Sequence, residues 1–189
     1  PLNGHIEIGN ANLNKYNLGW WRSQCGAVMQ EGYLFSDTIA RNIAVSDDEI
    51  DTDRLRHAAQ TAHIAEYIEG LPLGYNTKIG QDGQGVSQGQ RQRILIARVV
   101  YKNPPFVFLD EATNALDANN DRAIVENLSE FYKGKTVVVV AHRLSTVKHA
   151  DRIVVLEGGR IVETGTHAEL TTRKGRYYEL VRNQLELGK

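Results

Sequence analysis

Three short, wholly apolar runs lie in the C-terminal half of the chain. None alternates with polar residues, which predicts strands buried on both faces, as in a parallel sheet covered by helices. The segment between the first two runs has one apolar helical face, so strand, helix and strand follow one another as in an α/β unit. The runs are residues 106–109, 137–140 and 153–156, and the helical face carries Ile124, Leu128 and Phe131.

Helical patterns precede these runs. Residues 37–71 have apolar side chains at helical spacing and end in Leu-Pro-Leu-Gly, before a glycine-rich loop over residues 80–85. Ser87 followed by Gln90 forms a capping box, which predicts a helix that begins there and ends at the Asn-Pro-Pro of residues 103–105.

The two ends of the chain carry local signals as well. Ile6 and Ile8 alternate as in a strand after an opening turn. Residues 157–160, Glu-Gly-Gly-Arg, predict a tight hairpin. Thr166 and Glu169 form a second capping box, and a final amphipathic helix is expected over residues 176–187.

Composition narrows the class of protein. The 189 residues suit one domain, or one domain with a small subdomain, and the net charge of -1 gives no basic excess that would favour nucleic acid. Cys25 is the only cysteine, so no internal disulfide is expected. No run approaches the about 18 apolar residues that span a bilayer, and no signal-peptide pattern opens the sequence. We therefore expect a soluble, cytoplasmic chain, for which a membrane partner remains open.

Two acids follow the first apolar run. Asp110 and Glu111 are expected at the carboxyl edge of the sheet, where α/β proteins bind ligands. Asp110 can hold Mg²⁺, a hard ion that prefers oxygen ligands, and Glu111 can orient or deprotonate an attacking water. An acidic helix start after a strand explains the pair equally well when it is taken alone.

Other polar positions are weaker signals by themselves. At Ser87, Gly89 and Gln90 a hydroxyl and a helix N-terminus converge into a possible anion site, although an ordinary capped helix has the same pattern. His142 follows the second apolar run and can hydrogen-bond a phosphate, or it is a surface loop histidine. Gln30 follows an apolar strand, and a single glutamine in that position does not by itself predict a function.

The order of these features resembles that of the ABC ATPase family, over essentially the whole chain. The resemblance implies an α/β fold: a P-loop NTPase-like parallel sheet core flanked by helices, with a helical subdomain. It divides the chain into a partial core over residues 1–36, a helical subdomain over 37–103 and a C-terminal core over 104–189. The matching elements are the Q-loop at Gln30, the signature at residues 86–90, the Walker B strand with Asp110 and Glu111, the D-loop ending in Asp117, and the switch histidine His142.

The resemblance also implies a mechanism. Two such domains stack head to tail around ATP and Mg²⁺, and they are coupled to a transmembrane domain at the cytoplasmic face of the membrane. Glu111, His142 and Gln30 would be the catalytic residues: Glu111 would polarise the water, and His142 would hold the γ-phosphate and the water. Asp110 and Gln30 would bind Mg²⁺, and Gln30 would also sense the transporter. The second domain would supply Ser87, Gly89 and Gln90 to the same nucleotide, and the D-loop residue Asp117 is expected among the residues that bind it. Positioning and charge stabilisation of this kind are what phosphoryl transfer needs.

Two departures from the family pattern are visible. The signature usually reads Leu-Ser-Gly-Gly-Gln, and here Val86 and Gln88 differ. Val86 stays apolar, whereas Gln88 replaces a glycine at a place where backbone approaches phosphate. Gln81 stands in a loop that resembles the exporter X-loop, which often has an acid nearby.

No complete P-loop pattern, G-x-x-x-x-G-K-[ST], occurs in the chain. Gly134, Lys135 and Thr136 are the only partial match, and Ser129 stands where its first glycine should be. Pro1, Gly4 and Ile6 match the stretch that follows the P-loop helix in the family. We therefore expect a domain truncated before Pro1, with its first strand, P-loop and first helix absent, and no ATP hydrolysis by the isolated chain.

Residues 30–43 resemble the exporter subfamily, and bacterial peptide and bacteriocin exporters most of all. Two alternatives stay open at this point. The chain could be a catalytically silent partner that completes another domain's ATP site, although Glu111 and His142 argue against a degenerate half. It could also be a non-transport ABC ATPase of DNA repair, although neither heptads nor a basic excess is present.

Overall fold

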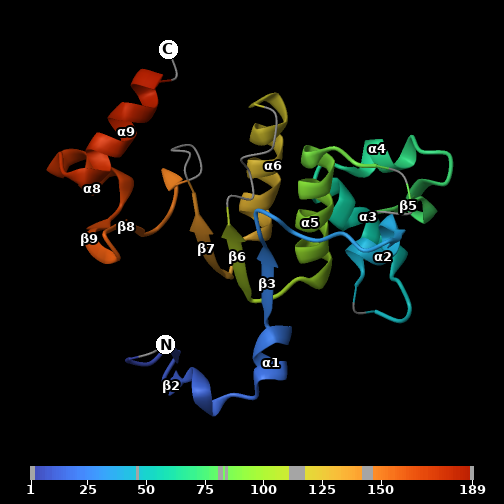
Figure 1. The fold of residues 1–189 in the computed structure, drawn as a ribbon, viewed down its shortest axis with the longest axis horizontal. Helices are drawn as coiled ribbons and strands as arrows, with labels where there is room; N and C mark the ends of the chain where they lie inside the picture. The colour runs from blue at the N-terminus through green and yellow to red at the C-terminus, as the bar shows by residue number, and fades with distance from the viewer. Residues whose placement is uncertain are drawn as a thin grey trace. The chain divides into compact units, whose positions relative to one another are not determined.

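The computed structural model describes residues 3–45, 47–80, 83, 85–110, 118–141 and 147–187 (Figure 1). The chain divides into two compact units, Pro1–Val138 and Val139–Lys189. None of the helices in the described ranges combines the length and the apolar composition that a bilayer-spanning helix requires.

A three-stranded sheet in the order β3-β6-β7 contains two of the predicted strands. Strands β3 (Cys25–Val28) and β6 (Phe106–Asp110) run parallel, with Cys25 opposite Phe106 and Val28 opposite Leu109. Strand β7 is Thr136–Val140. The strands expected at 106–109 and 137–140 are confirmed, and the helix α6 (Ala118–Phe131) lies between them in the chain.

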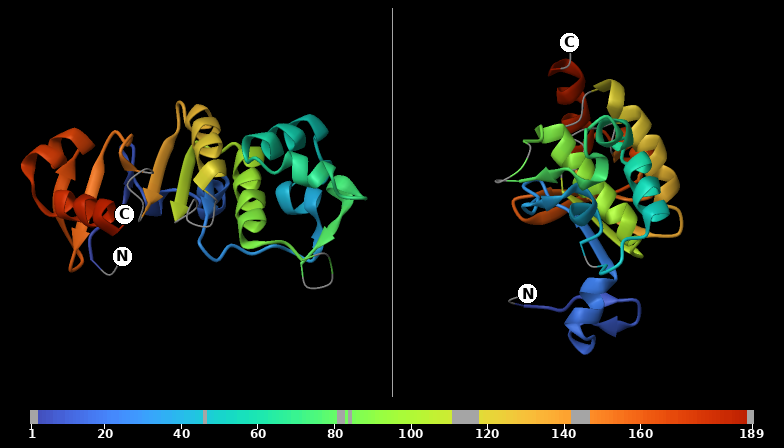
Figure 2. Two further views of the ribbon diagram at one scale, coloured as in Figure 1. Left: turned by 90° about the horizontal axis from the view of Figure 1, so that it is seen from above. Right: turned by 90° about the vertical axis from the view of Figure 1, so that its right-hand side faces the viewer.

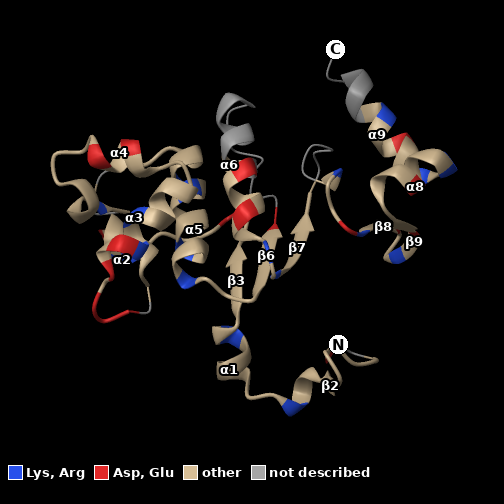
Figure 3. Ribbon diagram, turned by 180° about the vertical axis from the view of Figure 1, so that it is seen from behind, with Lys and Arg blue, Asp and Glu red and all other residues tan. Residues whose placement is uncertain are grey.

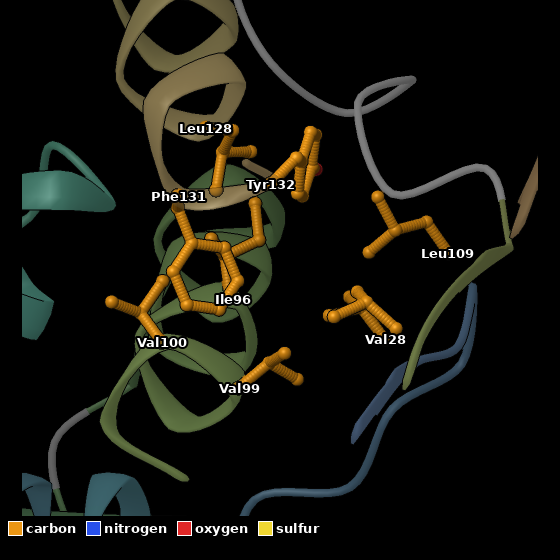
Figure 4. A pocket seen from close by; sticks show the side chains of 9 residues that line it. Val28, Ile96, Val99, Val100, Leu109, Leu128, Phe131 and Tyr132 are labelled. Carbon is orange, nitrogen blue, oxygen red and sulfur yellow. The ribbon is translucent and has the colours of Figure 1, made fainter. Parts of the chain in front are cut away.

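Two helices cover one face of this sheet. Val28 and Leu109 point from the strands toward Ile96 and Val99 of α5 (Gln88–Lys102) and toward Leu128 of α6 (Figure 4). The void left between these side chains is only about 10 Å³. The contact layer is therefore closely packed, as expected for the core of an α/β protein.

The opposite face of the sheet differs from the prediction. Phe108 of β6 and Val138 of β7 keep 37% and 48% of their surface exposed. The expectation of strands buried on both faces is therefore wrong for the described part of the chain. An apolar run indicates that its side chains favour burial. It does not show that helices are present to cover both faces of the sheet.

The segment predicted as helical over 37–71 is several short elements. Strand β4 (Asp37–Thr38) pairs with β5 (Lys78–Ile79), and the helices between them are α2 (Ile39–Ile43), α3 (Thr52–Thr61) and α4 (Ala65–Glu69), followed by the 3-10 turn η2 (Gly74–Asn76). The breaks have local causes. Thr38 and Asp51 cap new helices with their side chains, and His63 has a φ of 52°, which ends α3.

The predicted helix after Ser87 is confirmed as α5, with its capping box and an end at Asn103. Most of its apolar side chains are buried, because α5 lies between the sheet and α3 (Figures 1 and 2). The helices from α2 to α6 carry both basic and acidic residues (Figure 3).

The N-terminal segment is built from small elements. Strands β1 (Glu7–Ile8) and β2 (Ala11–Asn12) form a two-stranded sheet, and the 3-10 turn η1 (Leu13–Lys15) and helix α1 (Leu18–Ser23) lead into β3. The stretch from 134 to 136 is a turn from α6 into β7, with Gly134 at a φ of 73° and Lys135 N donating to Tyr132 O at 3.0 Å. Its resemblance to a P-loop is therefore limited to the sequence.

The second unit is a hairpin with two helices. Strand β8 (Ile153–Glu157) pairs antiparallel with β9 (Arg160–Gly165), so the expected place of residues 153–156 in a parallel sheet is wrong. The predicted turn is confirmed, with positive φ angles at Gly158 and Gly159. The helices are α8 (His167–Arg173), whose capping box is confirmed, and α9 (Arg176–Leu187). Ile153, Val155, Leu170 and Tyr177 form the core of this unit.

Candidate functional site

The parallel pairing of β3 and β6 brings Gln30 and Asp110 to one edge of the sheet. Val28 lies opposite Leu109, so the residues directly after them leave the sheet at the same carboxyl edge. Asp110 is the last residue of β6 and is half-buried. Gln30 is exposed in a turn that closes with Gly32 N donating to Met29 O at 3.2 Å. This edge is where ligands bind in α/β proteins.

Several of the predicted residues lie outside the described part of the chain. These are Glu111, Asp117, His142 and Gln81, together with the rest of the D-loop. Their proposed roles rest on the sequence alone.

The donor set at this edge fits a magnesium ion bound together with a nucleotide. The Asp110 carboxylate at the end of β6 and the Gln30 amide oxygen in the turn after β3 are hard donors at the same edge. Mg²⁺ usually takes one or two protein oxygens and fills its other positions with water and phosphate oxygens. Two donors are therefore enough for a metal that arrives with ATP.

The N-terminus of α5 carries the second group of candidate residues. Gln90 N donates to Ser87 Oγ at 3.2 Å, and Ser87 N donates to Gln90 Oε1 at 2.8 Å. Ser87 is exposed and Gly89 is half-buried. Gln88, which departs from the family pattern, begins the helix with an exposed side chain, so it leaves the cap intact.

Helix α5 runs antiparallel to β3. Lys102 at its end donates to Cys25 O at 2.6 Å, at the start of the strand. A Cβ on Gly26 would lie 2.9 Å from Val99 Cγ1, and one on Gly32, beyond the strand, would overlap Leu95 Cδ1. The N-terminus of α5 therefore extends past the carboxyl edge of the sheet.

Ser87 lies eight residues before Leu95, or about 12 Å at 1.5 Å per helical residue. One copy of the chain thus brings Gln30 and Asp110 together at one sheet edge. It holds Ser87 and Gln90 at a separate place. The resemblance implies that these two groups of residues contact two different nucleotides in a head-to-tail dimer. This assignment stays a prediction.

The close approach of residues 26–32 to α5 was missed in the sequence. Gly26 and Gly32 flank Gln30 on both sides of the strand end, and each leaves no room for a side chain against α5. A glycine inside an apolar strand pattern is the signal for such close approach. The same region holds Asn42 and Arg98, which the sequence analysis also left without a role.

Comparison with known proteins gives a consistent answer. The profile of the ABC transporter family matches residues 1–114. An ATP-dependent lipid A-core flippase of Alkalilimnicola ehrlichii is 48% identical over 97% of this chain and 31% of its own length. The exotoxin translocation ATP-binding protein PaxB of Pasteurella aerogenes is 44% identical over 98% of this chain and 26% of its own length.

A solved structure gives the same result in three dimensions. A bacterial Atm1-family ABC exporter with ATP bound matches with a TM-score of 0.93 and 38% identity, over 98% of this chain and 33% of that one. The chain thus spans about a third or less of the length of these relatives. Lipid and toxin exporters are both among them, so the narrower likeness to peptide exporters stays a prediction. The family match, the shared fold and the order of the motifs together show that this chain belongs to the ABC transporter family.

Proposed function

We propose that residues 1–189 belong to a nucleotide-binding domain that binds and hydrolyses ATP to drive export across a membrane. The observation that carries the proposal is the placement of Gln30 and Asp110 at one carboxyl sheet edge, with the capped N-terminus of α5 beyond it. The domain would work at the cytoplasmic face, attached to a transmembrane domain. We expect it to hydrolyse ATP and leave substrate choice to that membrane domain.

Asp110 and Gln30 would hold the magnesium ion in this site. When bound, the ion neutralises charge that develops on the phosphate oxygens. Glu111 would accept a proton from the attacking water, and His142 would donate a hydrogen bond to the γ-phosphate. Each of these groups positions the reactants or stabilises charge, which is the main requirement of phosphoryl transfer.

Ser87, Gly89 and Gln90 would serve the nucleotide held by a second, head-to-tail domain. Ser87 Oγ accepts the Gln90 N–H, so its own hydrogen stays available to a phosphate oxygen. The backbone N–H groups of the first turn of α5 add the positive end of the helix dipole. Asp117 would lie at the contact between the two domains.

Residues 1–189 by themselves contain no P-loop pattern, and we propose that they do not hydrolyse ATP in isolation. Hydrogen bonds to charged groups contribute about 1.5–3 kcal/mol each. The absence of three P-loop hydrogen bonds to the phosphates would therefore cost about 5 kcal/mol or more, which weakens the affinity for ATP roughly a thousandfold. Steady phosphate release by the isolated chain, abolished by Glu111→Gln, would overturn this part of the proposal.

The test of the function uses a complete transporter that carries residues 1–189. We expect Mg²⁺-dependent phosphate release, and a fall of about 10²–10⁴-fold in Glu111→Gln, the range for loss of a general base. Glu130→Gln is the matched control, because Glu130 is exposed on α6 and its carboxylate pairs with the exposed Lys133. Equal hydrolysis by wild type and Glu111→Gln would contradict the proposal.

A further inference from the structure

Arg98 of α5 holds the backbone of the segment that follows Gln30. Its Nε donates to Asn42 O at 2.8 Å, and one terminal nitrogen donates to Tyr33 O at 3.1 Å. Its guanidinium carbon lies 5.5 Å from the centre of the Phe35 ring. A single side chain therefore joins three segments of the chain, which are α5, the end of α2 and the stretch after the Q-loop.

Asn42 completes this contact from the other side. It is fully buried, and its Oδ1 accepts Phe35 N at 2.8 Å and an Arg98 terminal nitrogen at 3.4 Å. Its Nδ2 donates to Phe35 O and Thr38 O, both at 3.0 Å. All hydrogen-bonding positions of the amide are in use, so the side chain has one orientation that satisfies them.

Apart from the close approach of Gly32 to Leu95, few contacts fix the segment that Arg98 and Asn42 hold. Residues 32–36 form no helix or strand, and Tyr33 and Phe35 are 66% and 46% exposed. Leu34 alone among these three is buried. A segment with so few buried apolar contacts depends on side-chain hydrogen bonds for its shape. Arg98 and Asn42 provide those bonds.

The choice of arginine follows from the geometry. The planar guanidinium presents donors in a fixed fork, which reaches Asn42 and Tyr33 at once, and a lysine ammonium has no such fork. Arg98 is half-buried, and this burial lowers the pKa of its guanidinium. The contact is thus a partly buried set of charge-assisted bonds.

We propose that Arg98, held by Asn42, is a positioning residue that ties the Q-loop segment to the helix capped by Ser87, so that Gln30 and the signature move as one body. The inference rests on the proposed function for its catalytic meaning. The connection that Arg98 and Asn42 make between the Q-loop segment and α5, called the tie below, rests on the contacts alone. The tie and its effect on catalysis are tested by separate measurements.

The tie is tested by amide hydrogen exchange in the complete transporter. The Phe35 amide is the direct reporter, because its proton is bonded to Asn42 Oδ1. Loss of one such bond in Asn42→Ala, or of its support in Arg98→Lys, is expected to speed exchange in residues 33–38 by about tenfold or more, with α3 unchanged. Faster exchange throughout α2 and α3 would make Arg98 a general folding residue and would overturn the proposal.

Lys102→Ala is the matched control. Lys102 is a cation of the same helix that also bonds two backbone carbonyls, Arg22 O at 2.9 Å and Cys25 O at 2.6 Å, at the N-terminal end of β3. Its removal is expected to leave exchange of residues 33–38 unchanged. An increase equal to that of Arg98→Lys would show that any lost contact of α5 loosens the segment, which would also refute the tie.

The catalytic meaning is tested by ATP hydrolysis in the same transporter. We expect Arg98→Lys to lower kcat several-fold with KM for ATP little changed, and Lys102→Ala to change neither. If exchange rises and kcat stays at the wild-type value, the tie exists and the positioning role is refuted. If the wild type does not hydrolyse ATP, the proposed function fails, and the positioning role falls with it, while the exchange data still decide the tie.

Discussion

Ser87 and Gln90 hold each other across the first turn of α5. Gln90 donates its backbone N–H to Ser87 Oγ at 3.2 Å, and Gln90 Oε1 accepts the backbone N–H of Ser87 at 2.8 Å. The two residues assigned to phosphate binding are therefore also the cap of the helix. A substitution at Ser87 affects both roles, and the roles separate only if the replacement keeps the cap.

Aspartate at position 87 separates them. Ser87→Asp keeps a side-chain acceptor for Gln90 N, so thermal unfolding is expected to stay close to wild type, whereas Ser87→Ala loses about 0.5–2 kcal/mol of stability. In the complete transporter, both variants are expected to lose ATP hydrolysis, because alanine lacks the hydroxyl and the aspartate carboxylate repels phosphate. Wild-type hydrolysis in Ser87→Asp would show that Ser87 serves only as a cap.

Gly32 has no room for a side chain. Its Cβ would overlap Leu95 Cδ1, and Leu95 is buried, so the leucine cannot move aside freely. We expect Gly32→Ala to destabilise the protein by about 1–3 kcal/mol in urea unfolding, the cost of overpacking. Gly85→Ala is the control, since a Cβ there meets nothing within 4 Å. A Gly32→Ala variant as stable as Gly85→Ala would contradict the close approach of this loop to α5.

Tyr101 links α5 to the start of α3. Its hydroxyl donates to Asp47 Oδ2 at 2.8 Å and accepts Asp51 N at 3.2 Å, and its ring is buried. Tyr101→Phe keeps the ring and removes both bonds, so we expect a loss of about 1–3 kcal/mol in the free energy of unfolding. An unchanged denaturation midpoint would mean that water replaces the hydroxyl at no cost.

The cap of α8 gives a pH dependence with a definite sign. Glu169 has a lowered pKa, mainly because its carboxylate accepts the Thr166 backbone N–H at 2.9 Å. A carboxyl with a lowered folded pKa contributes stability above its unfolded pKa, about 4.3, and loses it as pH falls through the folded value. We expect an NMR titration midpoint for Glu169 below that of a free glutamate. Glu169→Gln should flatten the stability profile in this acidic range.

Local signals predicted the elements that local chemistry decides. The capping boxes at Ser87 and Thr166 and the apolar run before Asp110 each specify an element within a few residues, and the structure has all three. The Gly158–Gly159 turn likewise predicted its hairpin.

Other features could not be predicted from hydrophobic patterns alone. Residues 153–156 look like the other apolar runs, and the turn that follows them, not the apolar pattern, indicates their antiparallel pairing. The helical pattern over 37–71 hid the break at His63, where a non-glycine residue takes a positive φ. Arg98 and Asn42 are 56 residues apart, and nothing local to either one predicts their contact.

We propose that Asp110 and Gln30 form the magnesium end of an ATP site. Calorimetric ATP binding by the complete transporter, with and without Mg²⁺, tests this assignment. We expect Mg²⁺ to strengthen binding in wild type and in Asp48→Asn, an exposed control, and the effect to disappear in Asp110→Asn. An equal magnesium effect in all three proteins would contradict the account.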